Sequence, residues 1–289
     1  MRVCLTCGHR FDSNDWTCDK CGYRPKYVDG YIAFAPELAN NNDGYAPKYF
    51  EQVDRCIEDS FWIKARKNLF LWAMHKYFPL ADSFLEIGCA TGLNISHFRE
   101  AFPKLKISGL ELFTEGLSFA RNRVSDAFIF QADARRIPFD KEFDVIGAFD
   151  VLEHVEQDTV VLDQMYQATR PGGGILVSVP QHPLLWSQRD EHLLHKRRYT
   201  RKEMAEKVRK AGFKIVRTTS FISLLFAGMI WDSLKNRRPN RNYNPLAELQ
   251  VGRATNATLT LFLSLERQLI KFGISFPVGG SLFLVAKRM

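Results

Sequence analysis

An apolar run that enters a glycine-containing turn constrains this chain more than any other feature. Residues 84–87 lead into the turn Gly-Cys-Ala-Thr-Gly at 88–92, a helical pattern follows, and a second apolar run ends at Glu111. In a β-α-β unit, an acid at this distance after the turn lies at the tip of the second strand, where it can accept hydrogen bonds from two ribose hydroxyls. The segment therefore predicts a site for a nucleoside-containing cofactor.

The turn departs from the fingerprint that binds dinucleotides. That fingerprint has small residues at three positions, so that the backbone can approach a pyrophosphate, whereas the residues here are Gly88, Ala90 and Leu93. Glu86 would repel a pyrophosphate and favours a cationic ligand. S-adenosylmethionine carries an ammonium group, a sulfonium group and a ribose, and therefore suits both Glu86 and Glu111. The alternative is an ordinary strand-turn-helix unit with incidental acids.

Four cysteines near the amino terminus form two C-x-x-C pairs. The pairs, Cys4 with Cys7 and Cys18 with Cys21, are separated by ten residues, and a glycine follows each. Such knuckles bring four thiolates to one tetrahedral zinc ion, which leaves no position for water or substrate. The start of the chain has no apolar signal core, so disulfides are the weaker alternative. We therefore expect a structural zinc ribbon, and binding of a partner by it is left open.

Composition and charge limit the class of protein. With 46% hydrophobic and 25% charged residues the chain resembles a globular protein. The longest stretch of low polarity, 221–231, is shorter than the roughly 20 residues that span a membrane. Residues 189–241 hold 15 Lys or Arg and 5 Asp or Glu, a net +10, which leaves 8 − 10 = −2 for the rest. A basic stretch suits nucleic acid, an anionic membrane or a phosphorylated substrate, and the alternative is a solvated helix face.

The segment 221–241 combines the apolar run with basic residues. This combination is typical of an interfacial membrane anchor, and its alternative is a helical cover over the sheet. We therefore predict a cytoplasmic protein that associates with a membrane, if at all, through a peripheral contact of residues 221–241.

Strand and helix patterns alternate after residue 80. Near-continuous apolar strands separated by helices predict an α/β fold with a doubly wound, Rossmann-like sheet. The candidate strands are 83–87, 106–111, 127–132, 143–149, 174–179, 213–219 and 281–286. The candidate helices are 93–102, 114–124, 158–169, 201–211 and, in the late insertion, 255–272. Helical spacing also runs from 49 to 78, whereas 25–48 is expected to have little regular structure.

These patterns divide the chain into five predicted parts. The parts are a zinc ribbon (1–30), a linker with amino-terminal helices (31–80), the core (81–220), an apolar and basic helical insertion (221–276) and the last core strand (277–289).

Two further motifs follow later strands. Gln131-Ala132-Asp133-Ala134 follows the third strand, and Asp150-Val151-Leu152-Glu153-His154 follows the fourth. With the 86–92 loop, Glu111 and the turn at 171–173, they resemble the class I S-adenosylmethionine-dependent methyltransferases, although Ala90 replaces the middle glycine of the loop. The second motif is similar to the ubiquinone-biosynthesis and small-molecule branch. The resemblance implies seven strands, of which the last is antiparallel.

The strand-end positions and the resemblance give a predicted site. The cofactor-binding residues are Glu86, Gly88, Cys89, Gly92, Glu111, Leu112, Asp133, Ala134, Phe149 and Asp150. Arg66 is a further candidate for the cofactor carboxylate, unless it is an ordinary helix-surface arginine. The loop 181–199 is similar to methyltransferase-domain proteins of glycan, lipid or secondary-metabolite assembly and can close over the site.

The acceptor side of the site is predicted from histidines and basic residues. The candidate substrate-binding residues are His192, His195, Arg198 and Tyr199, unless the loop is only a structural lid. His154 is the first candidate for a general base that removes a proton from a hydroxyl acceptor, and its alternative role is to fix its own loop.

Three functions remain open at this point. The first is methyl transfer to a small-molecule, lipid-linked or glycan-like acceptor. The second is methylation of ribosomal or transfer RNA, which the zinc ribbon and the basic charge favour, although the Asn/Asp-Pro-Pro-Tyr/Phe motif of amino-methylating enzymes is absent. The third is a non-enzymatic cofactor-binding or interaction protein, which the intact acids disfavour.

Overall fold

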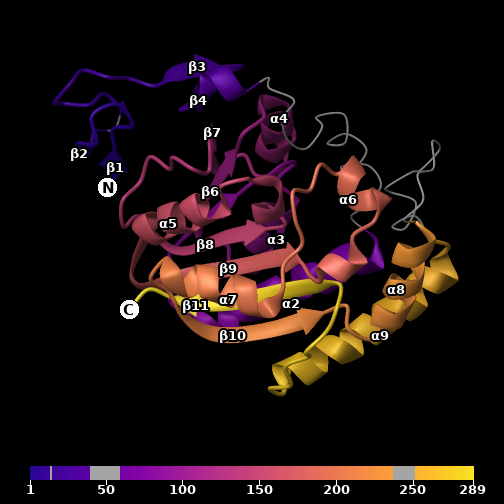
Figure 1. Cartoon of the computed structure of the whole chain (residues 1–289). Coiled ribbons are helices and arrows are strands. Elements are labelled where there is room, and N and C mark those ends of the chain that lie inside the picture. Colours follow the sequence, from indigo (N-terminus) through magenta and orange to yellow (C-terminus); the bar gives the residue numbers. More distant parts are fainter. Residues whose placement is uncertain (14, 40–58, 237–250) are drawn as a thin grey trace.

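A nine-stranded sheet organises the chain (Figure 1). The computed structural model describes residues 1–13, 15–39, 59–236 and 251–289. The strands lie in the order β10-β11-β9-β8-β5-β6-β7-β4-β3. The seven strands of the core are β5 (Ser83–Ile87), β6 (Lys106–Glu111), β7 (Phe128–Gln131), β8 (Phe143–Phe149), β9 (Thr169–Pro180), β10 (Lys214–Phe221) and β11 (Ser281–Lys287).

The pairing of these strands confirms the predicted fold. Strands β5, β6, β7, β8 and β9 are parallel to one another. Strand β11 is antiparallel to both β9 and β10. All residues of β5 are buried, as are those of β11 except its last. Strands buried along their whole length need helices on both faces of the sheet.

Helices cover both faces. One face carries α2 (Phe61–Tyr77), α3 (Leu93–Ala101), α4 (Thr114–Arg123) and α9 (Arg253–Lys271), and the other carries α5 (Asp158–Ala168) and α7 (Arg201–Lys210). Helices α6 (Gln188–His192) and α8 (Phe226–Lys235) lie at the periphery (Figure 1). None of the described helices has the combined length and apolarity needed to cross a lipid bilayer.

Local capping explains where the helices begin and end. The Ser60 hydroxyl accepts a hydrogen bond from the Ile63 N–H at 3.3 Å, which starts α2 at Phe61. The helix expected from residue 49 therefore begins later, and 49–58 lie outside the described residues. At α7 the predicted cap is present, because Thr200 accepts from the Glu203 N–H at 3.2 Å.

The segment after the ribbon differs from its prediction. Strands β3 (Lys26–Val28) and β4 (Tyr31–Ala33) form a hairpin, and β4 pairs with β7. The Gln131 side chain fixes this pairing, since it accepts from the Ala35 N–H at 3.1 Å and donates to the Ala35 carbonyl at 2.8 Å. The expectation of little regular structure is therefore wrong for 26–33, and the sheet has nine strands in place of seven.

The cysteine-containing region packs where the parallel strands begin. Strands β1 (Arg2–Val3) and β2 (Arg10–Phe11) pair with each other, and the Val3 N–H donates to the Pro138 carbonyl at 3.0 Å. Trp16 is buried with its ring 4.8 Å from that of Phe34 and 5.4 Å from that of Phe139. This region therefore joins the amino end of the sheet through an aromatic cluster.

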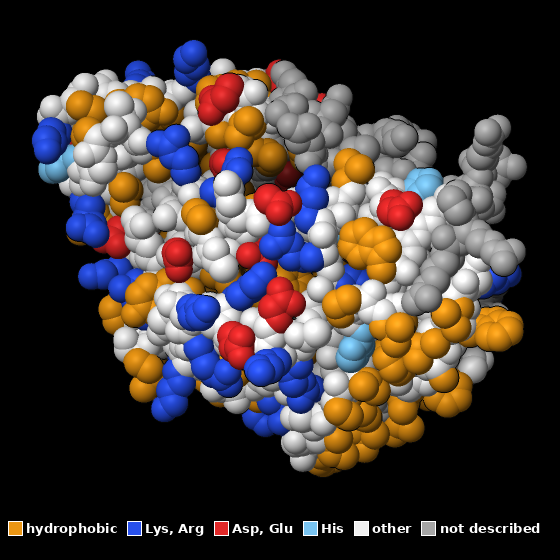
Figure 2. All heavy atoms as spheres, viewed as in Figure 1, with side chains coloured by type: hydrophobic (Ala, Val, Ile, Leu, Met, Phe, Trp, Pro, Cys, Tyr) orange, Lys and Arg blue, Asp and Glu red, His pale blue; other side chains and the backbone are white. Residues whose placement is uncertain are grey.

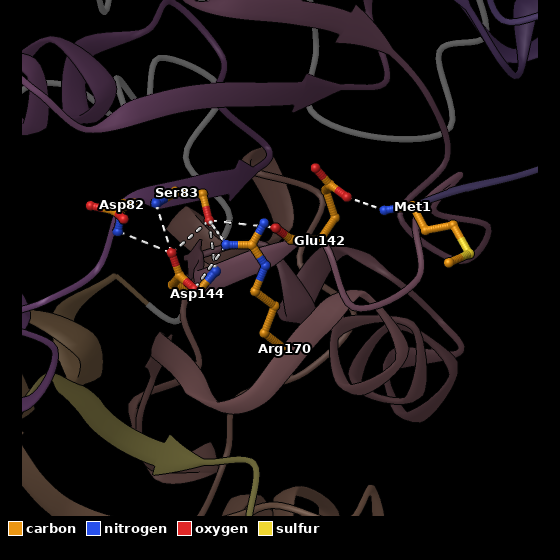
Figure 3. A network of polar contacts seen from close by, with 6 residues as sticks. All are labelled: Met1, Asp82, Ser83, Glu142, Asp144 and Arg170. Atoms are coloured by element: carbon orange, nitrogen blue, oxygen red, sulfur yellow. Dashed lines mark hydrogen bonds and ion pairs between the residues drawn. The ribbon is translucent and has the colours of Figure 1, made fainter. Parts of the chain in front are cut away.

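A polar network closes the same end of the sheet (Figure 3). The Asp144 carboxylate accepts hydrogen bonds from the Asp82 N–H at 3.0 Å, from the Ser83 hydroxyl at 2.8 Å and from Arg170 at 3.1 Å. Burial opposes ionisation of Asp144, but these donors outweigh it and lower its pKa. Beside them the amino-terminal ammonium group of Met1 pairs with Glu142.

Candidate functional site

A cavity of about 840 Å³ opens at the opposite end of the sheet, where the strands finish. Its walls come from the residues that follow β5, β6, β7, β8 and β9, from α2, and from the loop around α6. Ligand pockets commonly measure about 300–1,000 Å³. One hollow therefore has room for a cofactor and for part of a second ligand.

The glycine loop forms one wall of the cavity. Gly88 and Gly92 have φ angles of +68° and +77°, which favour glycine. A Cβ on Gly88 would come within 2.6 Å of Val151, and a Cβ on Gly92 within 2.7 Å of the Ala120 backbone. The loop therefore needs both glycines to pack against its neighbours. Ala90 tolerates a φ of +46° at the middle position.

The end of β6 places Glu111 beside this loop. Its carboxylate accepts hydrogen bonds from the Ala90 N–H at 3.0 Å, from Leu112 at 2.7 Å and from Phe113 at 3.2 Å. Burial raises the pKa of Glu111, and these backbone donors only partly offset the effect. Because Glu111, Leu112 and Phe113 line the cavity, the acid and its loop face any nucleoside held there.

Glu86 lies behind the loop and is not among the residues that line the cavity. Its Oε1 accepts from the Asn94 amide at 2.7 Å, while its buried Oε2 has no hydrogen-bond partner among the described residues. Burial raises the pKa of Glu86 to about 8, although the Asn94 hydrogen bond favours the charged form. An acid kept in so unfavourable a position fits a site that a cation later occupies.

The Asp133 side chain has a partner that the sequence did not indicate. Arg135 binds its two oxygens, with Nε at 3.0 Å from Oδ1 and Nη2 at 2.7 Å from Oδ2. Asp133 and Ala134 still line the cavity, as do Gly88, Cys89 and Phe149. The Asp133 carboxylate, which was predicted to bind the cofactor, is therefore shared with Arg135.

Asp150 and Arg66 form an ion pair on the cavity wall. Arg66 Nη1 lies 2.6 Å from Asp150 Oδ2, and its guanidinium stacks 4.1 Å from the Trp62 ring centre. Ser178 donates to the other Asp150 oxygen at 3.1 Å. Asp150 has a φ of +56°, a strained conformation of the kind that clusters at functional sites. Arg66 is therefore a buried residue of the site and not a helix-surface arginine.

The loop around α6 brings a second charged group to the cavity. His195 Nδ1 lies 2.8 Å from Asp190 Oδ1, and Arg198 Nε lies 2.7 Å from the same oxygen. Burial opposes ionisation of Asp190, but the His195 and Arg198 hydrogen bonds lower its pKa to about 2. Asp190 thus stays ionised and orients His195. The sequence reasoning singled out His195 and Arg198 but missed Asp190, five positions earlier, because the turn that joins them was not recognised.

His154 and Glu153 face the same loop. The rings of His154 and His195 lie 4.8 Å apart, and one donor atom each of Glu153, His154 and His195 falls within 4.8 Å of the others. Burial lowers the pKa of His154 to about 3, and the neighbouring His195 and Lys196 add to the effect. Burial also holds the pKa of Glu153 well above its ordinary value. His154 is consequently neutral near pH 7 and is a weak base.

Besides Glu86, three of the predicted residues do not reach the cavity. Tyr199 is fully buried and donates to Asp158 Oδ2 at 2.7 Å, so it cannot meet a substrate. His192 lies on α6 with Nδ1 2.9 Å from the Gln188 carbonyl and is not among the lining residues. Gly92 caps α3 behind the loop. The prediction that Tyr199 binds substrate is therefore wrong.

The four amino-terminal cysteines lie together at the other end of the sheet. Their sulfur atoms fall within 4.8 Å of one another, with Cys4 and Cys21 at 3.6 Å and Cys7 and Cys18 at 3.7 Å. Four thiolates about 2.3 Å from a tetrahedral zinc ion would lie about 3.8 Å apart. The spacing therefore fits one zinc ion and is too long for disulfides.

The sequence of this chain matches a known protein family. A family model described as a methyltransferase domain matches residues 49–218. The chain is 24% identical over 166 residues to a candidate S-adenosylmethionine-dependent methyltransferase of Mycolicibacterium smegmatis, covering 56% of this chain and 63% of the relative. It is 29% identical over 103 residues to a Streptomyces venezuelae dTDP-3-amino-3,4,6-trideoxy-alpha-D-glucopyranose N,N-dimethyltransferase (34% and 43%). It is 32% identical over 95 residues to a fatty-acid O-methyltransferase of M. smegmatis (32% and 35%). The aligned segments thus span less than two thirds of each relative.

Solved structures share the fold. The candidate methyltransferase in the Haloferax volcanii complex with the Trm112 methyltransferase activator superimposes with a TM-score of 0.54 at 15% identity, covering 84% of this chain and 93% of that one. Phosphoethanolamine N-methyltransferase 2 of Haemonchus contortus, in complex with S-adenosyl-L-methionine, gives 0.54 at 17% identity, covering 91% and 62%. At these identities the likeness extends to the fold alone.

Proposed function

Because this chain belongs to the methyltransferase-domain family, we propose that it transfers a methyl group from S-adenosylmethionine to a small-molecule, lipid-linked or glycan-like acceptor. The observation that carries the proposal is the single cavity that joins the glycine loop and Glu111 to the His195 loop. A methyl donor and its acceptor must lie in line and in contact, and one shared hollow allows this.

The residues around the loop fit the cofactor. Glu111 Oε2 accepts one described hydrogen bond and has a lone pair left for a ribose hydroxyl, and Gly88 lines the cavity. Glu86 lies behind the loop with its Oε1 bound to Asn94, and a cation bound in the cavity would favour its charged form. When bound, S-adenosylmethionine supplies a methyl group that its sulfonium already activates. The protein then contributes mainly position and orientation.

His195 is better suited than His154 to accept a proton from the acceptor. His195 donates a hydrogen bond from Nδ1–H to Asp190, which leaves Nε2 without a proton and able to accept one. Ionised Asp190 also stabilises the charged imidazole that results. The depressed pKa of His154 opposes the same role. We therefore place the general base at His195, with Asp190 as its positioning residue.

The cavity wall on the acceptor side is apolar with basic edges. Leu193, Ile222 and Met229 line it together with Arg189 and Lys196. Such a wall suits an acceptor that joins an apolar portion to an anionic or hydroxyl-rich one. The named activities of two relatives, on a dTDP-linked amino sugar and on a fatty acid, are consistent with an acceptor of this kind.

We also propose that residues 1–30 hold one structural zinc ion through Cys4, Cys7, Cys18 and Cys21. The sulfur spacing supports this assignment. The ribbon lies at the amino end of the strands, and the described lining of the methyl-transfer cavity contains no residue before Leu38. That separation disfavours the alternative in which the ribbon delivers RNA to the site, although the basic 189–241 stretch keeps RNA as an outcome to test.

The proposal is tested by incubating the protein with methyl-labelled S-adenosylmethionine and separate lipid, nucleotide-sugar and RNA fractions. We expect label in the lipid or sugar fraction. His195→Asn should lower kcat by roughly 100-fold to 10,000-fold and leave cofactor affinity unchanged. His192→Asn, in the same loop but outside the cavity, is the matched control. Label confined to RNA would reject the proposed acceptor class, and equal turnover by the two variants would reject His195 as the base.

A further inference from the structure

Exposed apolar side chains gather on one part of the surface. Of the seventeen large hydrophobic residues that are exposed in the described part of the chain, nine lie between 224 and 278. Figure 2 shows them as an orange area at the lower right, over the helices that Figure 1 labels α8 and α9. Folded monomers rarely leave so concentrated an apolar area in water unless it meets something.

Helix α9 has an apolar stripe on its outer face. Leu261, Leu265 and Phe272 follow one another at helical spacing and are 72%, 54% and 84% exposed. The opposite face is buried through Leu263 and Ile270. Since the inner face already packs against the fold, the outer stripe is not needed for the core.

Helix α8 connects this surface to the cavity. Met229 lines the cavity, whereas Trp231 and Leu234 on the same helix point outward and are 75% and 51% exposed. Glu266 of α9 accepts hydrogen bonds from the N–H groups of Ser223 and Leu224 at 2.8 and 2.9 Å, just before α8. The two helices are therefore tied together, and one of them separates the cavity from the apolar surface.

The charges around the apolar area are mostly positive. The basic residues of the two described helices are Lys235, Arg253, Arg267 and Lys271. Their acids are Asp232 and Glu266, of which Glu266 is buried and bound to the backbone. Aromatic and aliphatic side chains beside lysine and arginine suit the boundary of an anionic bilayer, where the apolar groups enter the acyl region and the cations meet headgroups.

We propose that the outer faces of α8 and α9 dock on an anionic lipid membrane and hold the cavity beside it. The acceptor is then an amphiphile whose head enters the cavity past Met229 while its apolar tail stays with the membrane. This substrate class rests on the proposed methyl transfer, whereas the docking itself does not. The proposed surface extends the predicted 221–241 contact to α9, and residues 237–241 of that prediction lie outside the described residues.

The test uses the full chain with vesicles of phosphatidylglycerol and phosphatidylcholine, measured by cosedimentation, and with pure phosphatidylcholine vesicles for comparison. We expect binding to the anionic vesicles that weakens with salt. The double variant Leu261→Glu/Phe272→Glu should bind at least about tenfold more weakly, because it places charges in the acyl boundary. Leu80→Glu, at a site that is 91% exposed and far along the chain from both helices, is the matched control.

Two further measurements keep the outcomes distinct. Calorimetric affinity for S-adenosylmethionine should be equal in the wild type and in the double variant, which shows that the variant is folded and that docking is separate from cofactor binding. Trp231→Glu, on α8, should weaken vesicle binding in the same direction. Absence of binding to the anionic vesicles, or equal binding by the double variant, would overturn the proposal. So would a dimer that the double variant converts to monomer, because the surface would then join two copies of the chain.

Discussion

Asp144 at the amino end of the sheet and Glu86 at the carboxyl end lie in opposite surroundings. At the amino end, Asp144 is surrounded by donors from Asp82, Ser83 and Arg170, and its pKa is lowered. At the carboxyl end, Glu86 keeps one oxygen without a described partner, and burial raises its pKa to about 8. Satisfied acids stabilise a fold, whereas acids left unsatisfied reduce its stability.

Strained backbone occurs at both ends of the sheet. Ala90 and Asp150 at the carboxyl end have φ angles of +46° and +56°, and Trp16 and Lys141 at the amino end have +63° and +48°, and such angles cost about 1–3 kcal/mol each. The two ends therefore differ in the acids compared above and not in backbone strain. The comparison indicates that the amino end maintains the structure and that the carboxyl end binds ligands, and each prediction below tests one side of it.

The largest effect is expected from removing a cysteine of the amino end. Cys18→Ser should abolish zinc binding and lower the melting temperature strongly, because metal-coupled folding contributes on the order of 10 kcal/mol. Cofactor affinity should change little, since the cavity lies at the other end. Metal analysis and thermal unfolding check both statements, with Asp19→Asn, an exposed residue of the same region, as the control. A full zinc content in Cys18→Ser would exclude the ribbon.

At the carboxyl end, Glu111→Ala should weaken S-adenosylmethionine binding by about 100-fold, the equivalent of one strong hydrogen bond to a charged group. Calorimetry measures the change. Glu115→Gln, an exposed acid in the first turn of α4, should bind as the wild type does. Equal affinities for both variants would show that Glu111 does not contact the cofactor.

Asp144→Asn tests the structural role of the amino end, and its expected effect on stability is smaller than that of Cys18→Ser. The variant should lose about 1–2 kcal/mol of stability, with no change in cofactor affinity. Because the folded pKa of Asp144 is lowered, its contribution is present above the unfolded pKa and disappears as pH falls through the folded pKa. The stability difference between wild type and variant, from denaturant unfolding, should therefore vanish in acid. A difference that persists there would contradict the role of the ionised network.

Glu86→Gln should change the stability of the fold least. It should raise the stability, whereas Asp144→Asn lowers it. The folded pKa of about 8 exceeds the ordinary 4.5, so Glu86 favours the folded state fully only below 4.5 and less as pH rises toward 8. Without cofactor, the variant should melt about 2–4 °C higher than the wild type at alkaline pH. It should also lose preference for S-adenosylmethionine over its demethylated product, which lacks the sulfonium charge. A lower melting temperature would show that Glu86 is a structural acid.

Most of the fold follows from local sequence signals. The apolar runs of the core strands and the caps at Thr200 and Gly212 are visible without any tertiary contact, and the strands β5, β6 and β8 lie where they were expected. The acids of the cofactor site were found in the same way, because strand ends in a parallel sheet meet at one edge.

The remaining features depend on long-range contacts. The β3–β4 hairpin exists because β7 and Gln131 supply its partners from about a hundred residues away. Asp190 becomes part of the site because Arg198 and His195 fold back onto it. The same folding buries Tyr199 against Asp158, which its position beside two cationic residues did not reveal.

Hydrogen–deuterium exchange with and without S-adenosylmethionine tests the division between the two ends most directly. If the carboxyl end binds the cofactor, protection should rise in 86–94, 110–113, 132–135 and 149–154. Exchange in 1–24 and 139–144 should stay the same. Protection that appears at the amino end and not at the carboxyl end, or no change anywhere at saturating cofactor, would contradict this account.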